Sequence, residues 1–174
     1  FSKLLRLVLD ESANNLITLK DEVKMLDLYL QLESLRFDSA FSYSINVDDN
    51  LDEEEIMLPT FLIHPIIENA VWHGLLHKSG ERRLIIQFLN KNDDKIHCII
   101  KDNGIGIDAA VIRKKERLNG ESQPSKGLIL VSDRLNLLQQ QYGIESYIKT
   151  EHLNDGASFS SGTKVTIQLP VIYE

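Results

Sequence analysis

The sequence predicts an α+β protein: a two-layer sandwich of a mixed β-sheet covered on one face by helices, with a helical appendage at the N-terminus. Some segments carry apolar residues at helical spacing and others alternate between apolar and polar residues. The two kinds do not follow one another in strict alternation, which argues against a purely parallel sheet. The length of 174 residues suits one ordinary domain with a core of its own.

Helical spacing begins at the N-terminus, where residues 1–9 form the end of a predicted helix. Thr18, followed by Asp21, is a typical N-cap, and it predicts a longer helix that extends to about Phe37. The apolar residues of this helix form two neighbouring stripes. Burial on two sides is therefore expected, either against its own domain or in a helical bundle or dimer.

The remaining segments alternate between strand and helix patterns. Pro59 precedes a predicted buried helix over residues 60–74 that stops at Gly74, and a second helix over residues 128–142 stops at Gly143. The acidic stretch 48–55 reads as a solvated turn. Strands are predicted at residues 41–47, 83–89, 96–101, 146–151 and 163–169.

Composition limits the classes of partner and compartment. The net charge is -7 without a lysine or arginine cluster, so nucleic acid is not an expected partner. The single cysteine, Cys98, excludes a disulfide framework and favours a reducing compartment. No segment reaches the roughly 20 uncharged residues that span a bilayer, so we expect a soluble protein. Because the sequence begins in mid-pattern without an initiator Met, we expect it to be a piece of a longer protein.

Glu68 and Asn69 form a polar pair inside the predicted buried helix. An unpaired polar group is costly to bury, so the pair requires a partner. A carboxylate beside an amide oxygen supplies hard oxygen ligands, and Mg²⁺ takes one or two of these together with phosphates and water. Taken alone, the pair could equally be a hydrogen-bonded structural element.

The sequence Asp102-Asn103-Gly104-Ile105-Gly106 comes directly after a predicted strand. Asp102 would therefore lie at the strand end and could accept a hydrogen bond from an exocyclic amine. The glycines would let a flat ring approach the main chain. Gly127, at the start of a helix, offers N–H groups to phosphate oxygens. Alone, these features also fit a tight turn and a helix start without a ligand.

Together, these motifs resemble the ATPase superfamily of DNA gyrase, heat-shock chaperones, histidine kinases and mismatch-repair ATPases. The segment from Glu68 to Gly74 resembles the N box, and the Asp102 motif resembles the first glycine box. The closing strand and the linker of LytS-type sensor histidine kinases are also matched, so the resemblance covers nearly the whole chain. The further matching segments are Lys126-Gly127-Leu128 with Asp133-Arg134-Leu135 (second glycine box), Gly162 to Pro170 (closing strand) and Leu19 to Phe37 (linker). The segment from Leu58 to Asn69 also resembles LytS-type kinases.

The resemblance implies a role for each matching residue. Asn69 would hold Mg²⁺ against the phosphates of ATP, Glu68 would assist phosphoryl transfer, and Asp102 would receive the adenine amine. The charged stretch 107–125 would be a lid over ATP. The purine of ATP would be contacted by Gly104, Gly106 and Ile107, and Thr163 would support Asp102. The phosphates would be contacted by Gly127, Leu128, Lys126 and His73.

Two departures from the family pattern affect phosphate contact. Trp72 stands where the family often has a basic residue, and Ser125 stands where it often has a glycine. Lys126 or His73 would have to compensate.

By this resemblance, residues 1–38 are the end of a helical dimerisation and linker region, and residues 39–174 are the ATP-binding catalytic domain. The implied function is that of a two-component sensor histidine kinase, which transfers the γ-phosphoryl group of ATP to a histidine upstream of Phe1 for relay to a response regulator. The whole protein would be a homodimer joined through its upstream helical hairpin. This part would be a cytoplasmic domain of an inner-membrane sensor.

Two alternatives remain. A non-catalytic nucleotide-binding or dimerisation module of a degenerate sensor kinase would explain Trp72 and Ser125. A chaperone or mismatch-repair ATPase would lack the kinase-type linker, so the segment from Thr18 to Phe37 argues against it.

Overall fold

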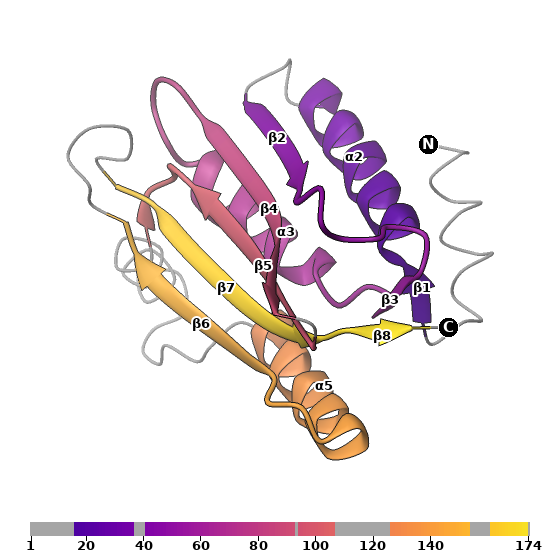
Figure 1. Cartoon of the computed structure of the whole chain (residues 1–174). Coiled ribbons are helices and arrows are strands. Elements are labelled where there is room, and N and C mark those ends of the chain that lie inside the picture. Colours follow the sequence, from indigo (N-terminus) through magenta and orange to yellow (C-terminus); the bar gives the residue numbers. More distant parts are fainter. Residues whose placement is uncertain (1–15, 37–40, 93, 107–125, 154–160, 174) are drawn as a thin grey trace.

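A five-stranded mixed sheet forms the centre of the molecule (Figure 1). The computed structural model describes residues 16–36, 41–92, 94–106, 126–153 and 161–173. The strand order is β2-β4-β5-β7-β6; β2 pairs with β4 in parallel and the other pairs are antiparallel. The strands are β2 (Ser42–Val47), β4 (Arg83–Asn92), β5 (Lys95–Asp102), β6 (Tyr147–His152) and β7 (Thr163–Pro170). All five lie where the sequence predicts strands.

A second, three-stranded sheet has the order β1-β3-β8 and was not predicted. Its strands are β1 (Leu16–Thr18), β3 (Ile56–Pro59) and β8 (Ile172–Tyr173). Each strand has at most four residues, which is too short for alternation to be visible. Pro59 ends a strand of this sheet and does not open a helix, contrary to the prediction.

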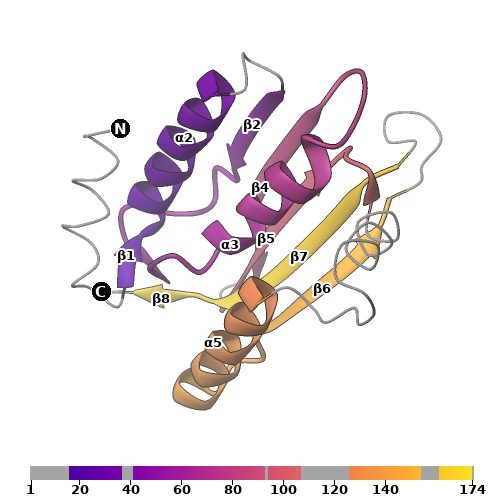
Figure 2. The same ribbon diagram turned by 180° about the vertical axis from the view of Figure 1, so that it is seen from behind.

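The described helices cover one face of the large sheet, which confirms the predicted fold class (Figures 1 and 2). They are α2 (Leu19–Arg36), α3 (His64–Asn69), its continuation η1 (Ala70–Leu75), which is a π-helix, and α5 (Lys126–Tyr142). α3 begins at His64 rather than near Thr60, because Phe61 has a positive φ of 59° and breaks the helical path before it. Gly143 follows α5 with a φ of 68°, as expected of a helix stop.

The core lies between the helices and the sheet. Along β5, Ile96, Cys98 and Ile100 are fully or nearly fully buried on the helix side. Leu26 and Leu30 of α2 belong to the same cluster, so α2 packs against the domain rather than standing apart from it. The division of the chain at residues 38 and 39 stays a prediction. None of the described helices is long and apolar enough to cross a membrane.

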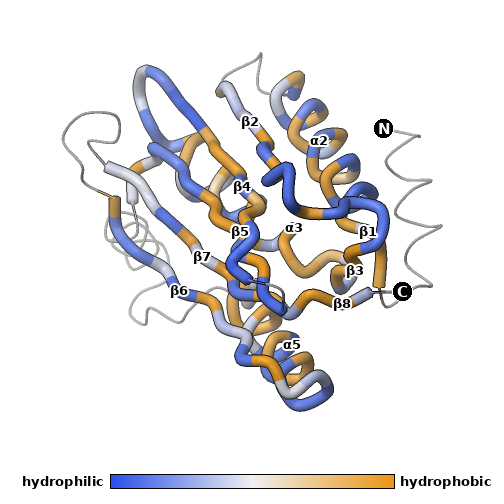
Figure 3. The backbone as a smooth tube through the Cα atoms, in the orientation of Figure 1, coloured by the Kyte–Doolittle hydropathy of each residue, from blue (hydrophilic) through white to orange (hydrophobic). Residues whose placement is uncertain are grey.

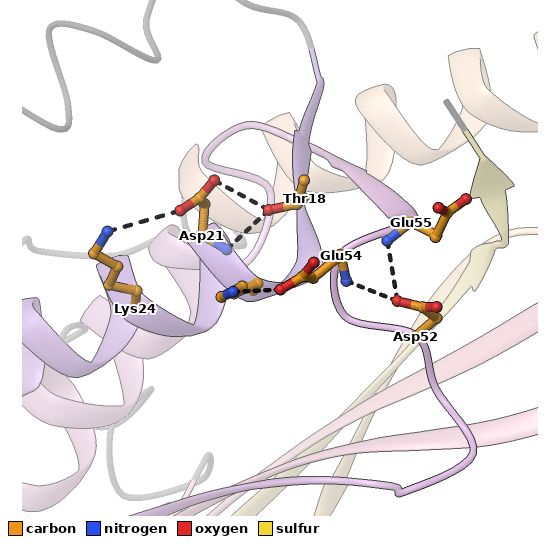
Figure 4. Close-up of polar contacts among 7 residues, drawn as sticks. Thr18, Asp21, Lys24, Asp52, Glu54 and Glu55 are labelled. Carbon is orange, nitrogen blue, oxygen red and sulfur yellow. Dashed lines mark hydrogen bonds and ion pairs between the residues drawn. The ribbon is translucent and has the colours of Figure 1, made fainter.

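The start of α2 is held by the predicted cap. The backbone N–H of Asp21 donates to Thr18 Oγ1 at 3.1 Å, and the Thr18 hydroxyl donates to Asp21 Oδ2 at 3.1 Å (Figure 4). The neighbouring acidic loop, hydrophilic in Figure 3, is ordered by its own turn: Asp52 Oδ1 accepts from the backbone N–H groups of Glu54 and Glu55 at 3.0 and 3.3 Å. Lys20 of α2 pairs with Glu54, so the loop is fastened to the first turn of the helix.

We expect Thr18→Ala to lower the free energy of unfolding by about 1 kcal/mol, because an N–H of the first turn loses its acceptor. Thr18→Ser keeps the hydroxyl and is the matched control. Urea denaturation at neutral pH measures both variants. Equal stabilities of the alanine and serine variants would show that this cap contributes nothing.

Candidate functional site

Asp102 is the last residue of β5, and its side chain is on the helix side of the sheet. Only 3% of the residue is exposed. Its Oδ1 accepts the backbone N–H of Gly104 at 2.9 Å. Thr163 lies opposite Asp102 on β7 and donates hydrogen bonds from its backbone and its side chain. The carboxylate is therefore held in one orientation at the end of the strand.

Burial raises the pKa of the Asp102 carboxyl to about 6, while the hydrogen bonds from Gly104 and Thr163 and the charge of Lys78 oppose this rise. At neutral pH the group is ionised, so both oxygens are acceptors only. An ionised carboxylate in a buried position can select a donor such as an exocyclic amine, since leaving it without its partner is costly.

Gly74 and Gly104 mark a place where two backbone segments touch. A Cβ at Gly104 would lie 2.5 Å from the carbonyl carbon of Gly74 and 2.7 Å from Asp102 Oδ1. Ile105 N–H also donates to the carbonyl of Gly74 at 3.3 Å. The helix was expected to stop at Gly74, but η1 continues to Leu75. Close contact with the Asp102 turn is thus the reason for glycine here.

Gly106 has a φ of 80°, which favours glycine, and the His152 ring lies against it. A Cβ at Gly106 would be 2.5 Å from His152 Cε1. Ser161 Oγ donates to the Gly104 carbonyl at 2.9 Å. The glycine turn is therefore enclosed by His152, at the end of β6, and Ser161, just before β7. The sequence analysis predicted a role for neither residue.

Asn103 joins the same turn to the start of β4. Its Oδ1 accepts the Arg83 N–H at 2.7 Å, its Nδ2 donates to the Glu81 carbonyl at 3.1 Å, and Lys78 donates to its backbone carbonyl. Asn103 stands inside the glycine motif and could have been noticed there. Lys78 and Glu81 are remote in sequence and have no motif that would point to them.

Glu68 and Asn69 end α3, one turn before Gly74. Glu68 is exposed, so the expectation of a buried polar pair is wrong for this residue: its carboxylate stays in water and requires no partner. Asn69 is half-buried and His73 is exposed. η1 begins directly after Asn69, and π-helical turns are frequent at functional sites.

Gly127, in the first turn of α5, meets α3 beside Asn69. A Cβ at Gly127 would lie 3.0 Å from Pro65 Cβ and 3.9 Å from Asn69 Nδ2. Leu128 is half-buried and packs against the core. Ile107, the predicted lid at 107–125 with Ser125, and the side chain of Lys126 lie outside the described residues.

The site therefore has two ends on the helix side of the sheet. One end is formed by Asp102, Thr163, Gly104 and Gly106. The other end is formed by Asn69 and Gly127. Gly74, on the helix that continues from Asn69, contacts Asp102 and so connects the two ends. Among the residues that the structure describes, no three His, Cys, Asp or Glu side chains gather in a way that could hold a metal ion. A metal at this site would have to take most of its ligands from a bound molecule and water.

Comparisons with known protein families and with known sequences both identify histidine kinases as similar to this chain. A family model described as histidine kinase matches residues 1–41. The sensor histidine kinase/phosphatase LytS of Staphylococcus aureus (strain Mu50) is 28% identical over 152 residues, which are 87% of this chain. The chain spans about a quarter of the length of that relative, with 25% covered.

Two solved structures share the fold. The mycobacterial sensor histidine kinase MprB superposes with a TM-score of 0.57 at 14% identity, covering 91% of this chain and 99% of that one. The catalytic domain of the histidine kinase ThkA gives a TM-score of 0.54 at 15% identity, covering 91% and 97%. At these identities the comparison establishes the architecture, and the arrangement of the site has to be judged from this chain's own residues.

Proposed function

Because this chain is homologous to LytS-type sensor histidine kinases and has the fold of histidine kinase catalytic domains, we propose that it is the ATP-binding catalytic part of a two-component sensor kinase. The observation that carries the proposal is the arrangement of Asp102, the Gly74–Gly104 contact and Asn69 beside Gly127 along one side of the sheet. A buried acceptor at one end and helix-terminal N–H groups at the other suit a nucleotide lying between them.

At the purine end, Asp102 accepts the exocyclic amine of adenine, and Thr163 keeps the carboxylate oriented. Gly104 and Gly106 line the purine in our proposal. A side chain at Gly104 would clash with the Gly74 backbone and one at Gly106 with the His152 ring, so glycine keeps the turn after Asp102 compact. Ile107 extends this end in our proposal. The pattern favours adenine over guanine, whose corresponding position is an acceptor and would face an ionised carboxylate.

At the phosphate end, the first turn of α5, at Gly127 and Leu128, presents backbone N–H groups and the positive end of the helix dipole to phosphate oxygens. Asn69 contributes one oxygen ligand to Mg²⁺, whose role is to neutralise phosphate charge. Lys126 and His73 add positive charge or hydrogen-bond donors. Glu68, exposed at the end of α3, orients or deprotonates the acceptor group.

The acceptor in this proposal is a histidine upstream of Phe1 in the whole protein, and the phosphoryl group passes on to an aspartate of a response regulator. The whole protein acts as a homodimer through its upstream helices, with this part as a cytoplasmic domain of a membrane sensor. The net charge of -7 does not favour nucleic acid as a partner.

We expect ATP binding to depend on Mg²⁺ in the wild type and to lose this dependence in Asn69→Ala. Mg²⁺ should strengthen wild-type binding about tenfold, or ~1.4 kcal/mol, because it screens the phosphate charge. Isothermal titration calorimetry with and without Mg²⁺ measures this. Asn136→Ala, the same change at an exposed position of α5, is the control and should keep the Mg²⁺ dependence.

Absence of ATP binding under both conditions would remove the basis of the proposal and favour the non-catalytic module. Binding that is equally Mg²⁺-dependent in Asn69→Ala would leave the nucleotide site standing and contradict the role of Asn69.

A further inference from the structure

Two rows of side chains face each other where the C-terminal half of α2 packs beside α3 and η1. The α2 row is spaced i, i+4, i+7 and the Glu68 row is spaced i, i+4, i+8, so each row lies along one side of its helix. The α2 row is Tyr29, Glu33 and Arg36; the Glu68 row is His64, Glu68 and Trp72.

The ends of the rows are in direct contact. The Tyr29 and His64 rings lie 4.3 Å apart between centroids at 61°, an edge-on arrangement. The guanidinium carbon of Arg36 lies 4.8 Å from the centre of the Trp72 ring, a cation–π contact. Trp72 also donates a hydrogen bond to the Tyr29 hydroxyl. These contacts fix the rotation of α3 and η1 relative to α2.

Glu33 and Glu68 lie between these two contacts. Glu33 is only 8% exposed, and its Oε1 is 3.8 Å from Arg36 Nη1. Its Oε2 accepts no hydrogen bond from any residue in the described ranges. Burial raises the pKa of Glu33; the charge of Arg36 opposes this, and the charge of Glu68 adds to it. The two carboxylates are therefore close enough to influence one another.

We propose that the α2 row positions Glu68 for phosphoryl transfer, with Arg36 and Glu33 as the positioning residues. The inference rests on the proposed function and assigns a part of the same reaction to α2. Glu68 is an exposed, flexible side chain, and fixing it costs up to ~2 kcal/mol of rotamer freedom. A rigid contact at Trp72, one turn beyond Glu68, and a neighbouring negative charge at Glu33 restrict the positions that its carboxylate takes.

This arrangement also gives the reaction a means of control. The α2 row belongs to the helix that continues the chain from its N-terminal segment, whereas Glu68 belongs to the nucleotide site. A shift or rotation of α2 would break the Arg36–Trp72 and Tyr29–His64 contacts together, since both rows are helical and rigid. Displacing a catalytic group by about 1 Å costs about 100-fold in rate.

The test uses the whole protein with its own acceptor histidine. We expect Arg36→Met to slow single-turnover autophosphorylation about tenfold while the Kd for ATP stays within about twofold of wild type. Glu33→Gln should change the rate in the same way, without changing the Kd. Arg36→Lys retains a cation for Trp72 and should recover most of the rate. Lys24→Met, on the same helix but in an exposed ion pair with Asp21, is the control.

A rate in Arg36→Met equal to that of the Lys24→Met control would overturn the inference. So would a parallel loss of rate and ATP affinity with a lowered Tm, because that pattern indicates a purely structural role. In either case a wild type that binds ATP and phosphorylates itself leaves the proposed function standing. A wild type that does neither removes the proposed function, and the inference with it.

Discussion

Replacing Asp102 by asparagine is expected to weaken ATP binding about 100-fold or more, equivalent to at least ~2.7 kcal/mol. The wild-type carboxylate has acceptors for both Gly104 N–H and an adenine amine, besides the Thr163 donors. Asparagine has a single acceptor oxygen. If that oxygen stays on Gly104 N–H, the amide NH₂ points at other donors and no acceptor remains for the nucleobase.

Binding of inosine triphosphate sharpens the test, because hypoxanthine lacks the amine. The wild type should prefer ATP, and Asp102→Asn should bind the two nucleotides almost equally, which isolates the amine contact as a double-mutant cycle does. Asp49→Asn, an exposed change in the β2–β3 loop, is the control. A variant that keeps the ATP preference would show that Asp102 does not read the base.

The same carboxylate predicts a pH dependence of binding. Its pKa is raised by burial to about 6, so it is ionised above that pH and protonated below it. Protonation replaces an acceptor by a donor, and wild-type affinity for ATP should therefore fall as the pH drops through about 6. The affinity of Asp102→Asn should show no such transition.

The sequence correctly predicted the helices and strands that have a long hydrophobic pattern, together with the residues at their ends. Asp102 at a strand end, Gly127 in the first turn of α5 and Gly143 after its last turn are all where the pattern put them. These positions depend on local signals that survive folding, namely periodicity and helix termination.

The failures have a common physical cause, which is that the decisive contact joins distant parts of the chain. Gly74 looked like a helix stop, but the Asp102 side chain is what favours glycine there, because a Cβ at Gly74 would lie 3.0 Å from Asp102 Oδ1. His152 and Lys78 reach the glycine turn only through tertiary structure. The start of α3 was misplaced because Pro59 fits a helix start equally well. Pro59 instead pairs with Leu16 of β1, and the positive φ of Phe61 delays the helix to His64.

Glu22 is the clearest example, because in the sequence it is an ordinary acidic residue in the first turn of a helix. In the structure it is 2% exposed, on the side of α2 that faces the core. Its Oε2 accepts no hydrogen bond within the part of the chain that the structure describes. Burial raises its pKa to about 8, and the positive charge of Arg134 on α5 only partly opposes this. Burial raises the pKa of the Cys98 thiol on β5, and the charge of Glu22 adds to this rise.

A raised carboxyl pKa destabilises the fold as the pH increases. In the unfolded chain Glu22 titrates at its ordinary pKa of 4.5, and in the folded protein at about 8. Between these values the folded state holds one more proton, so the free energy of unfolding falls with rising pH, by at most ~1.4 kcal/mol per pH unit. The loss is complete above about pH 8 and absent below about pH 4.5.

We therefore expect Glu22→Gln to be more stable than the wild type at pH 8.5, by up to about 4 kcal/mol, and to differ little from it at pH 4.5. Glutamine has nearly the same shape but no charge to bury between α2, α5 and the sheet. Urea denaturation from pH 4.5 to 8.5 gives the difference between the two proteins, in which the other titrating groups cancel. Glu55→Gln, at an exposed position of the β2–β3 loop, is the control. Parallel stability curves for Glu22→Gln and the wild type would mean that Glu22 is solvated or paired in solution, and that α2 does not seal this side of the core.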